Sequence, residues 1–298
     1  MLKKLLNQAD ITIEITVEGP LLIKSGREGG ADPALPDMQF VRTNGRIYLP
    51  GSSLKGVFRS YAEKIARTAG ARCCNPFEND TASRDCFCGK LLEKDGDGAA
   101  IYKKSCVVCR LFGSTAMASR IKFNDAHAIG DLRSEIRTGV AIDRMLGSVA
   151  HGPFDFEVIT SGTFETSIHL RNFELWQLGL LGLVLRDMSE GLIPIGFGKS
   201  RGLGDVKAKV KEIKTRYLGG FTSDPETTVL GIGAIVKGKE AERYGFSQND
   251  ILELETKGEE VKEEIFGTQV VFGEEALMEI FQRSVECWKG KVENEQEK

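Results

Sequence analysis

Residues 46–65, RIYLPGSSLKGVFRSYAEKI, predict a strand, a turn and a helix in close succession. RIYL is typical of a short strand, and Pro50-Gly51 turns the chain. After this turn, a serine (Ser52 or Ser53) is expected to cap a helix. Apolar side chains then recur at the spacing of an amphipathic helix, namely Leu54, Val57, Phe58, Tyr61 and Ile65.

The flanking sequence extends this pattern in both directions. Residues 11–18, ITIEITVE, alternate strictly between apolar and polar side chains and predict a half-buried first strand. Downstream we expect two strands, a leucine-rich helix and a closing strand at residues 119–129, 163–170, 173–188 and 206–213. The order strand, helix, strand, strand, helix, strand predicts an α+β fold with a ferredoxin-like core that carries insertions.

Charge divides the chain near Gly219. Residues 217–298 hold 18 acidic and 9 basic side chains, whereas residues 1–216 hold 25 acidic and 31 basic ones. A basic body permits a polyanionic partner, which the overall isoelectric point of about 5.8 does not suggest. The alternative, a merely solvated acidic segment, stays open. We expect a core over residues 1–219 and an acidic C-terminal extension of unassigned role over 220–298, ending in a solvated tail, VENEQEK.

Composition excludes several classes of protein. The chain has 298 residues, of which 41% are hydrophobic and 28% charged, as in an ordinary globular protein. No run approaches the roughly 18 to 20 apolar residues that a membrane helix requires. The N-terminus MLKKLLNQAD lacks the long apolar region of an export signal, so we expect a cytoplasmic protein with no membrane partner.

Cysteines are concentrated in one segment, which we call the cysteine-rich insertion (about residues 71–112). Six of the seven lie between Cys73 and Cys109. In a cytosolic chain such clustering favours a metal site over disulfides. Cys106 and Cys109 are spaced to bind one Zn²⁺ together, and the other two ligands of a structural site come from Cys73, Cys74, Cys86 and Cys88. Reduced or redox-active thiols are the alternative.

Two further segments have the chemistry of anion sites. Residues 196–204 contain four glycines and the cations Lys199 and Arg201, so main-chain N–H groups and positive charge occur together. At the start of the helix after Pro50, hydroxyls and Lys55 meet exposed N–H groups. The alternatives are an ordinary glycine-rich turn and an ordinary serine cap.

Four motifs occur in an order that resembles a known family. These are PGSSLKGVFRS at 50–60, CVVCRLFGS at 106–114, VAIDR at 140–144 and GFGKSRGLGDV at 196–206. Together they resemble the RAMP superfamily, and more narrowly the backbone subunits of type III CRISPR effector complexes. The resemblance spans roughly residues 11–213 and leaves the acidic extension outside.

The resemblance implies an RRM-related subunit that polymerises along a CRISPR guide RNA. Partners would be the guide, a target RNA, copies of itself or related RAMP subunits, and other type III effector subunits. Sequence-independent phosphate contacts would come from Ser52, Ser53, Lys55, Arg59, Lys199 and Arg201. Residues 130–162 would form a protruding thumb that wedges into the guide–target duplex, with Arg133, Arg137 and Arg144 on the backbone and Met145 and Leu146 as apolar wedges.

The resemblance also implies cleavage of the target RNA. In the family, catalysis depends on an aspartate between the first strand and the PGSS element, together with Mg²⁺ or Mn²⁺. Asp32 and Asp37 lie there, and Asp37 fits the family position better. A subunit that binds without cutting, and a zinc-stabilised scaffold that binds no RNA, are the competing hypotheses.

For zinc, the family pattern implies Cys74, one of Cys86 or Cys88, Cys106 and Cys109. We take Cys86 as the second ligand of a structural Zn²⁺ site.

Overall fold

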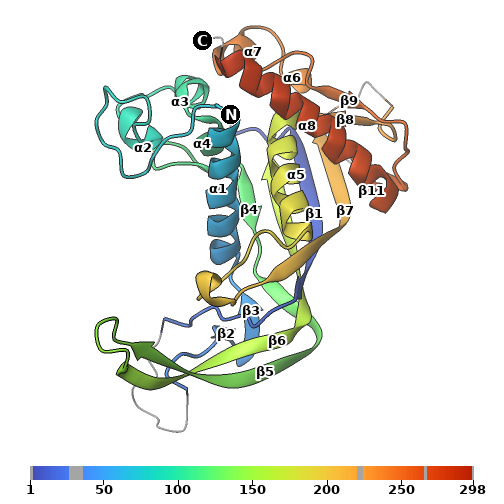
Figure 1. Cartoon of the computed structure of the whole chain (residues 1–298). Coiled ribbons are helices and arrows are strands. Elements are labelled where there is room, and N and C mark those ends of the chain that lie inside the picture. The colour runs from blue at the N-terminus through green and yellow to red at the C-terminus, as the bar shows by residue number, and fades with distance from the viewer. Residues whose placement is uncertain (1–2, 27–35, 220–223, 265–266, 297–298) are drawn as a thin grey trace.

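The computed structural model describes residues 3–26, 36–219, 224–264 and 267–296. These residues form a mixed α+β fold around one large sheet with antiparallel strand pairs (Figure 1). The strands of the sheet are β1 (Asn7–Val17), β2 (Arg42–Thr43), β3 (Arg46–Leu49), β4 (Ile121–Phe123), β5 (Ala126–Ile142), β6 (Val149–Arg171), β7 (Val206–Leu218), β10 (Glu260–Glu264) and β11 (Gly267–Phe272). They are ordered β10-β11-β7-β1-β6-β5-β3-β2, and β4 also pairs with β6.

Strand β1 lies inside the sheet, between β6 and β7. Its side chains alternate as predicted: Ile11, Ile13 and Ile15 are fully buried, whereas the residues between them are partly exposed. Helices α1 (Gly51–Thr68) and α5 (Leu175–Ser189) cover the buried face (Figure 1). An apolar row repeating every two residues therefore meets helical apolar faces in one core.

Helix α1 begins where the sequence predicted, but its cap is different. Pro50 is the N-cap residue, and Ser52 and Ser53 lie inside the helix, so the predicted serine cap is wrong. Instead, the Asp125 carboxylate accepts a hydrogen bond of 2.8 Å from the Gly51 N–H. A Cβ at Gly51 would lie 2.4 Å from the Phe123 carbonyl oxygen, so only glycine allows this close approach to the sheet.

Strands β5 and β6 form a long hairpin that extends from the body (Figure 1). Near the body they bury Phe164 and Ile168 in the core. Farther out, most side chains from residue 130 to residue 152 are exposed. The predicted protruding hairpin over 130–162 is therefore present, with its paired strands continuing into the main sheet.

The cysteine-rich insertion lies between α1 and β4 in the chain and forms a lobe beside α1 (Figure 1). It contains three short helices, α2 (Cys88–Leu91), α3 (Gly98–Lys104) and α4 (Val107–Phe112). Its apolar residues Val107, Leu111 and Phe112 join the main core. The lobe is thus packed onto the body rather than tethered to it.

The C-terminal extension packs against α5 and adds strands to the sheet beside β7. It contains β8 (Thr228–Leu230), α6 (Ile232–Ile235), α7 (Lys239–Tyr244), β9 (Ile251–Glu253) and α8 (Glu274–Gln296), besides β10 and β11. Strand β11 pairs with β7, and α8 packs along α5, with the Trp176 and Trp288 ring centroids 6.0 Å apart. The predicted solvated tail continues α8 as far as Gln296, where Val292 is buried and Glu293, Asn294 and Gln296 are exposed.

None of the helices in the described ranges combines the length and apolar character needed to cross a membrane.

Candidate functional site

The tip of the hairpin presents apolar side chains to solvent. Met145 is 94% exposed and Leu146 is 80% exposed. The Asp143 carboxylate accepts hydrogen bonds of 2.8 Å from the N–H groups of both residues, and these bonds lower the pKa of Asp143. A local Asx turn therefore holds the two apolar side chains outward.

Exposed cations accompany this apolar tip. Arg133, Arg137 and Arg144 are all exposed along β5 and its turn. Arg137 lies 3.8 Å from Glu135, an exposed pair that contributes little to stability. On the same hairpin Ile136 and Ile142 are more than half exposed. The structure thus brings Arg133, Arg137, Arg144 and Met145 together on one protruding element.

The loop that carries Asp37 runs beside strand β6 of this hairpin. Asp37 is exposed, and its Oδ2 accepts a hydrogen bond of 2.8 Å from the Asp155 N–H. The Met38 N–H donates to the Asp155 carbonyl, and the Glu157 N–H donates to the Met38 carbonyl. We call residues 36–41 together with 154–157 the hairpin base. Asp32, the alternative catalytic residue, lies outside the described residues.

An ion pair stabilises the hairpin base. Arg42 donates to both carboxylate oxygens of Glu157, which also accepts a hydrogen bond of 3.0 Å from the Phe40 N–H. Burial pushes the pKa of Glu157 up, but Arg42 and the Phe40 N–H outweigh burial and hold this pKa below its usual range. The chain is therefore fixed to β6 at Asp37 and directly after it.

The segment 20–25 connects the hairpin base to the glycine-rich loop. Leu21 pairs with Ile159 of β6, and the Val41 N–H donates to the Ile23 carbonyl. On its other side, the Leu22 carbonyl accepts from the Phe197 N–H at 2.7 Å. Two regions far apart in sequence, residues 36–41 and 196–204, therefore flank one extended segment.

The glycine-rich loop contains the short helix η1 (Lys199–Arg201), with Gly198 and Gly202 at its ends in the left-handed conformation. Arg201 lies over the Phe197 ring at 4.8 Å, and Lys24 lies over the same ring at 4.0 Å. Burial, and then the charge of Lys64 on α1, lower the pKa of Lys199. The loop therefore concentrates positive charge beside α1.

The first turn of α1 adds a further cation. Lys55 is half-buried, and burial followed by the charge of Arg59 lowers its pKa. Ser52 is exposed and Ser53 is half-buried. These three residues lie at the helix end that faces the hairpin, as the path from β3 into α1 shows (Figure 1).

Arg59, one helical turn after Lys55, contacts the cysteine-rich insertion. Its guanidinium donates to the Gly113 carbonyl at 3.2 Å and to the Cys109 sulfur at 3.6 Å, and it pairs with Glu63 at 3.1 Å. The structure therefore places this predicted RNA contact beside the cysteines of the insertion.

Four buried cysteines converge at that point: Cys74, Cys88, Cys106 and Cys109. Their sulfur atoms all lie within 4.8 Å of one another, with 3.5 Å between Cys74 and Cys109. Tetrahedral Zn²⁺ with Zn–S bonds of about 2.3 Å spaces its ligands roughly 3.8 Å apart. A buried set of four thiols with this spacing fits a structural zinc ion.

Main-chain N–H groups point at two of the four sulfur atoms. The Cys106 N–H donates to the Cys88 sulfur at 3.3 Å, and the Cys109 N–H donates to the Cys106 sulfur at 3.4 Å. Neighbouring thiols, Cys109 first, hold the pKa of Cys106 well below its ordinary value. Donors directed at sulfur stabilise the charged form that binds metal.

Cys88 occupies the position that the sequence analysis assigned to Cys86. Cys88 is the first residue of α2 and its sulfur enters the cluster, whereas the Cys86 sulfur contacts the Phe87 carbonyl at 3.8 Å. A Cβ at Gly89 would lie 2.1 Å from the Thr115 hydroxyl, so α2 is pressed closely against the chain after α4. This close packing of α2 directs the cysteine after Phe87, not the one before it, at Cys106. Cys73 is likewise outside the set.

The sequence analysis did not include several charged residues of these surfaces. Lys24 and Lys64 add to the positive charge around the glycine-rich loop. Asp155 adds a second carboxylate to the hairpin base and accepts a hydrogen bond of 2.6 Å from the Thr138 hydroxyl. These residues belong to none of the motifs that the sequence analysis identified, and only the fold brings them into the site.

Comparison with known proteins agrees with this arrangement. A profile of the RAMP superfamily matches residues 14–207, which is more than half of the chain. That range runs from β1 to the start of β7 and includes the cysteine cluster, the hairpin and the glycine-rich loop. No curated protein matches the chain. The chain therefore belongs to the RAMP superfamily of CRISPR-associated, RNA-binding subunits.

Proposed function

We propose that this protein is a backbone subunit of a type III CRISPR effector complex and holds the guide RNA through its phosphates. The observation that carries the proposal is the hairpin β5–β6, with three exposed arginines and the exposed apolar residues Met145 and Leu146 at its tip. Arginine contacts phosphate oxygens, and apolar side chains separate stacked bases. The hairpin would act as the thumb at the guide–target duplex.

The guide would continue across the cations of the first turn of α1 and the glycine-rich loop. Lys55, Lys199 and Arg201 lie on α1 and the glycine-rich loop, and Lys24 adds a fourth charge. The amines of Lys55 and Lys199 have lowered pKa values, so phosphate would be a favourable neighbour of both. Binding through such contacts is independent of sequence and falls steeply with salt.

We interpret residues 1–219 as a ferredoxin-like core and residues 220–298 as its extension. The strand order β7-β1-β6-β4, with α1 and α5 on one face, supports this interpretation. Copies of this chain or related RAMP subunits, together with other type III subunits, would line up along the guide. A structural Zn²⁺ held by Cys74, Cys88, Cys106 and Cys109 would brace the insertion.

We further propose that the subunit cuts the target RNA and that Asp37 is its catalytic residue. Asp37 is exposed on the hairpin base, where the thumb would displace a target nucleotide. Mg²⁺ or Mn²⁺ bound between a carboxylate and RNA phosphates would offset the negative charge that develops on the phosphate. The hydrogen bond from Asp155 would hold the Asp37 carboxylate beside the strand. The 2′-hydroxyl would give its proton to water as its oxygen attacks the adjacent phosphorus and the bond from phosphorus to the 5′-oxygen breaks. The 5′-oxygen would take a proton from water, leaving a cyclic phosphate and a 5′-hydroxyl.

The test uses the assembled complex with guide and labelled target RNA. The Asp37→Ala variant is compared with Asp131→Ala, which removes another exposed aspartate of the hairpin. We expect cleavage at this subunit's position to fall by at least about 100-fold for Asp37→Ala only, with guide retention unchanged in both. Equal cleavage by Asp37→Ala and wild type would overturn the assignment of Asp37. Guide retention with no cleavage at this position by the wild type would instead favour a subunit that binds the guide without cutting.

Guide binding itself is tested on the purified chain. Reversing the charge of Arg133, Arg137 and Arg144 should weaken binding of a repeat-derived RNA. The slope of the logarithm of affinity against the logarithm of salt concentration should become shallower by the equivalent of about three phosphate contacts. RNA binding that is absent at low salt in the wild-type chain would instead favour a zinc-stabilised scaffold.

A further inference from the structure

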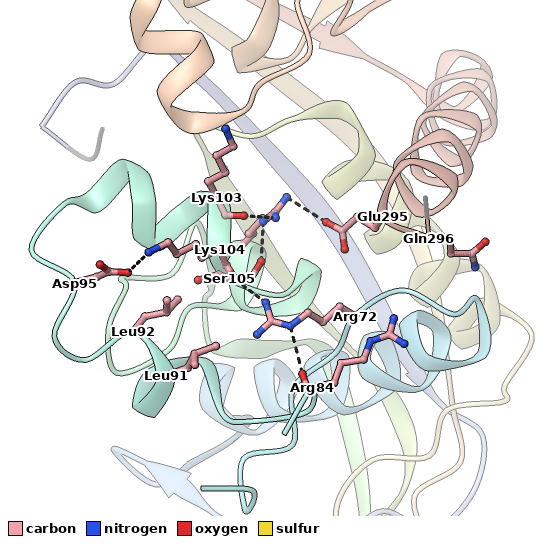
Figure 2. A pocket seen from close by; sticks show the side chains of 11 residues that line it. Arg72, Arg84, Leu91, Leu92, Asp95, Lys103, Lys104, Ser105, Glu295 and Gln296 are labelled. Atoms are coloured by element: carbon pink, nitrogen blue, oxygen red, sulfur yellow. Dashed lines mark hydrogen bonds and ion pairs between the residues drawn. The ribbon is translucent and has the colours of Figure 1, made fainter. Parts of the chain in front are cut away.

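A cavity of about 840 Å³ lies between the cysteine-rich insertion and the end of α8 (Figure 2). The elements that line it, the insertion and the C-terminal end of α8, lie at the end of the molecule away from the hairpin (Figure 1). Five cationic side chains line it: Arg72, Arg84, Lys103, Lys104 and Arg110. The acidic side chains that line it are Asp95 and Glu295, so the cavity carries a clear excess of positive charge.

Main-chain carbonyls orient two of the arginines. Arg110 is buried, and its guanidinium donates to the Ser105 carbonyl at 2.9 Å and to the Lys103 carbonyl at 2.7 Å. Arg72 donates to the Lys104 carbonyl at 2.5 Å and to the Arg84 carbonyl at 3.4 Å. A carbonyl fixes a guanidinium in place without cancelling its charge, so these arginines are pre-organised and remain attractive to an anion.

The acidic residues compensate only part of this charge. Asp95 pairs with Lys104 at 2.9 Å, and Glu295 pairs with Arg110 at 3.4 Å. Within the described ranges, neither Arg84 nor Lys103 makes a side-chain hydrogen bond or an ion pair with an acidic group. Cations gathered in a recess without counter-charges raise its free energy, and a bound anion would relieve this.

We propose that this cavity is a second anion site and binds a phosphate group. Cations approach from the loop before α2, from α3 and from α4, which suits the several oxygens of a phosphate better than a single planar carboxylate. Leu91 and Leu92 supply an apolar wall, and the volume suits a ligand of nucleotide size. The phosphate would come from an RNA chain or from a free nucleotide, which share this chemistry.

The first experiment measures binding of inorganic pyrophosphate to the full chain by titration calorimetry at low salt. The test variant is Arg84→Glu with Lys103→Glu, both exposed side chains whose main-chain contacts stay in place. The matched control is Lys90→Glu with Lys94→Glu, which makes the same charge change in the same insertion outside the cavity. We expect at least about a tenfold loss of affinity in the test variant and less than about threefold in the control.

A variant that is expected to raise the affinity, rather than lower it, keeps the test informative even if the double variant does not fold. Glu295→Gln removes a negative charge from the cavity and should raise the affinity for pyrophosphate about threefold or more. No binding by the wild-type chain, equal loss in the test and control variants, or unchanged affinity in Glu295→Gln would each overturn the proposal.

Competition then identifies the source of the phosphate. Displacement of pyrophosphate by a short single-stranded RNA, but not by adenosine monophosphate, would assign the site to an RNA chain, and the reverse would assign it to a free nucleotide. Either result supports a phosphate site. The pyrophosphate measurement does not depend on the hairpin, so failure of guide binding would leave it unchanged.

Discussion

The carboxylate of Asp37 accepts a hydrogen bond of 2.8 Å from the main-chain N–H of Asp155. Asp155 belongs to β6, so the proposed catalytic group is attached directly to the strand that continues into the proposed thumb. Any displacement of the hairpin would also move this carboxylate. The contact therefore gives Asp37 two separable properties, a charge and a hydrogen-bond acceptor.

The Asp37→Asn substitution separates these properties. The amide oxygen can still accept from the Asp155 N–H, but the side chain carries no charge to bind a divalent cation. We expect Asp37→Asn to lose target cleavage as fully as Asp37→Ala. Hydrogen exchange at the hairpin base should stay slow in Asp37→Asn and become faster in Asp37→Ala. Wild-type cleavage by Asp37→Asn would show that the charge is not needed.

Zinc content distinguishes Cys88 from Cys86. Cys88→Ser removes a thiolate from the four-sulfur set, so the purified protein should lose its metal and on the order of 5 kcal/mol of stability. Cys86→Ser removes a buried thiol of nearly the same size outside the set. It should keep about one zinc ion per chain by elemental analysis. Retention of zinc by Cys88→Ser would exclude Cys88 as a ligand.

Local patterns in the sequence were sufficient to predict the elements that build the body. Two patterns each indicate a face that one neighbouring layer buries: the alternation of residues 11–18 and the apolar spacing from Leu54 to Ile65. The proximity of Cys106 and Cys109 was also predictable, because both thiols lie on one turn of chain. In each case the signal lies within a few residues.

What sequence reasoning missed depends on contacts between distant segments. Cys86 and Cys88 are equivalent in spacing, and only the packing of α2 beneath Thr115 selects Cys88. Arg59 is a predicted RNA contact, and only the structure shows that its guanidinium also donates to the Cys109 sulfur. The acidic C-terminal extension was left without a role, and only the structure shows that the apolar stripe of α8 meets α5, whose residues are buried on nearly every side.

Asp250 makes the stability of the fold depend on pH. It is buried, and its two carboxylate oxygens accept from the Leu175 and Gly233 N–H groups, each at 3.0 Å. Burial, followed by the charge of Glu174, raises the pKa of Asp250 to about 7. The folded chain then holds a proton that the unfolded chain releases near pH 4. Stability from this group is therefore complete at low pH and is lost as the pH rises through about 7.

The expected loss between about pH 4 and pH 7 is a few kcal/mol at most. Urea unfolding at a series of pH values measures it, and Asp250→Asn is the control because an amide does not titrate. The difference in stability between the wild type and Asp250→Asn should change with pH across this window. A difference that is constant with pH would contradict the raised pKa of Asp250.

Gly179 tests whether the extension is a structural part of the body. A Cβ at Gly179 on α5 would lie 2.0 Å from the Ser284 carbonyl oxygen on α8, a main-chain atom that cannot move alone. Gly179→Ala must therefore separate the two helices, and we expect a loss of about 2–4 kcal/mol in urea unfolding. Gly290→Ala is the matched control, because Gly290 lies on α8 with open space around it. It should leave stability unchanged or raise it by up to about 1 kcal/mol. If both variants behaved alike, α8 would not pack on α5 in solution, and the acidic extension would be the loose appendage that its composition suggests.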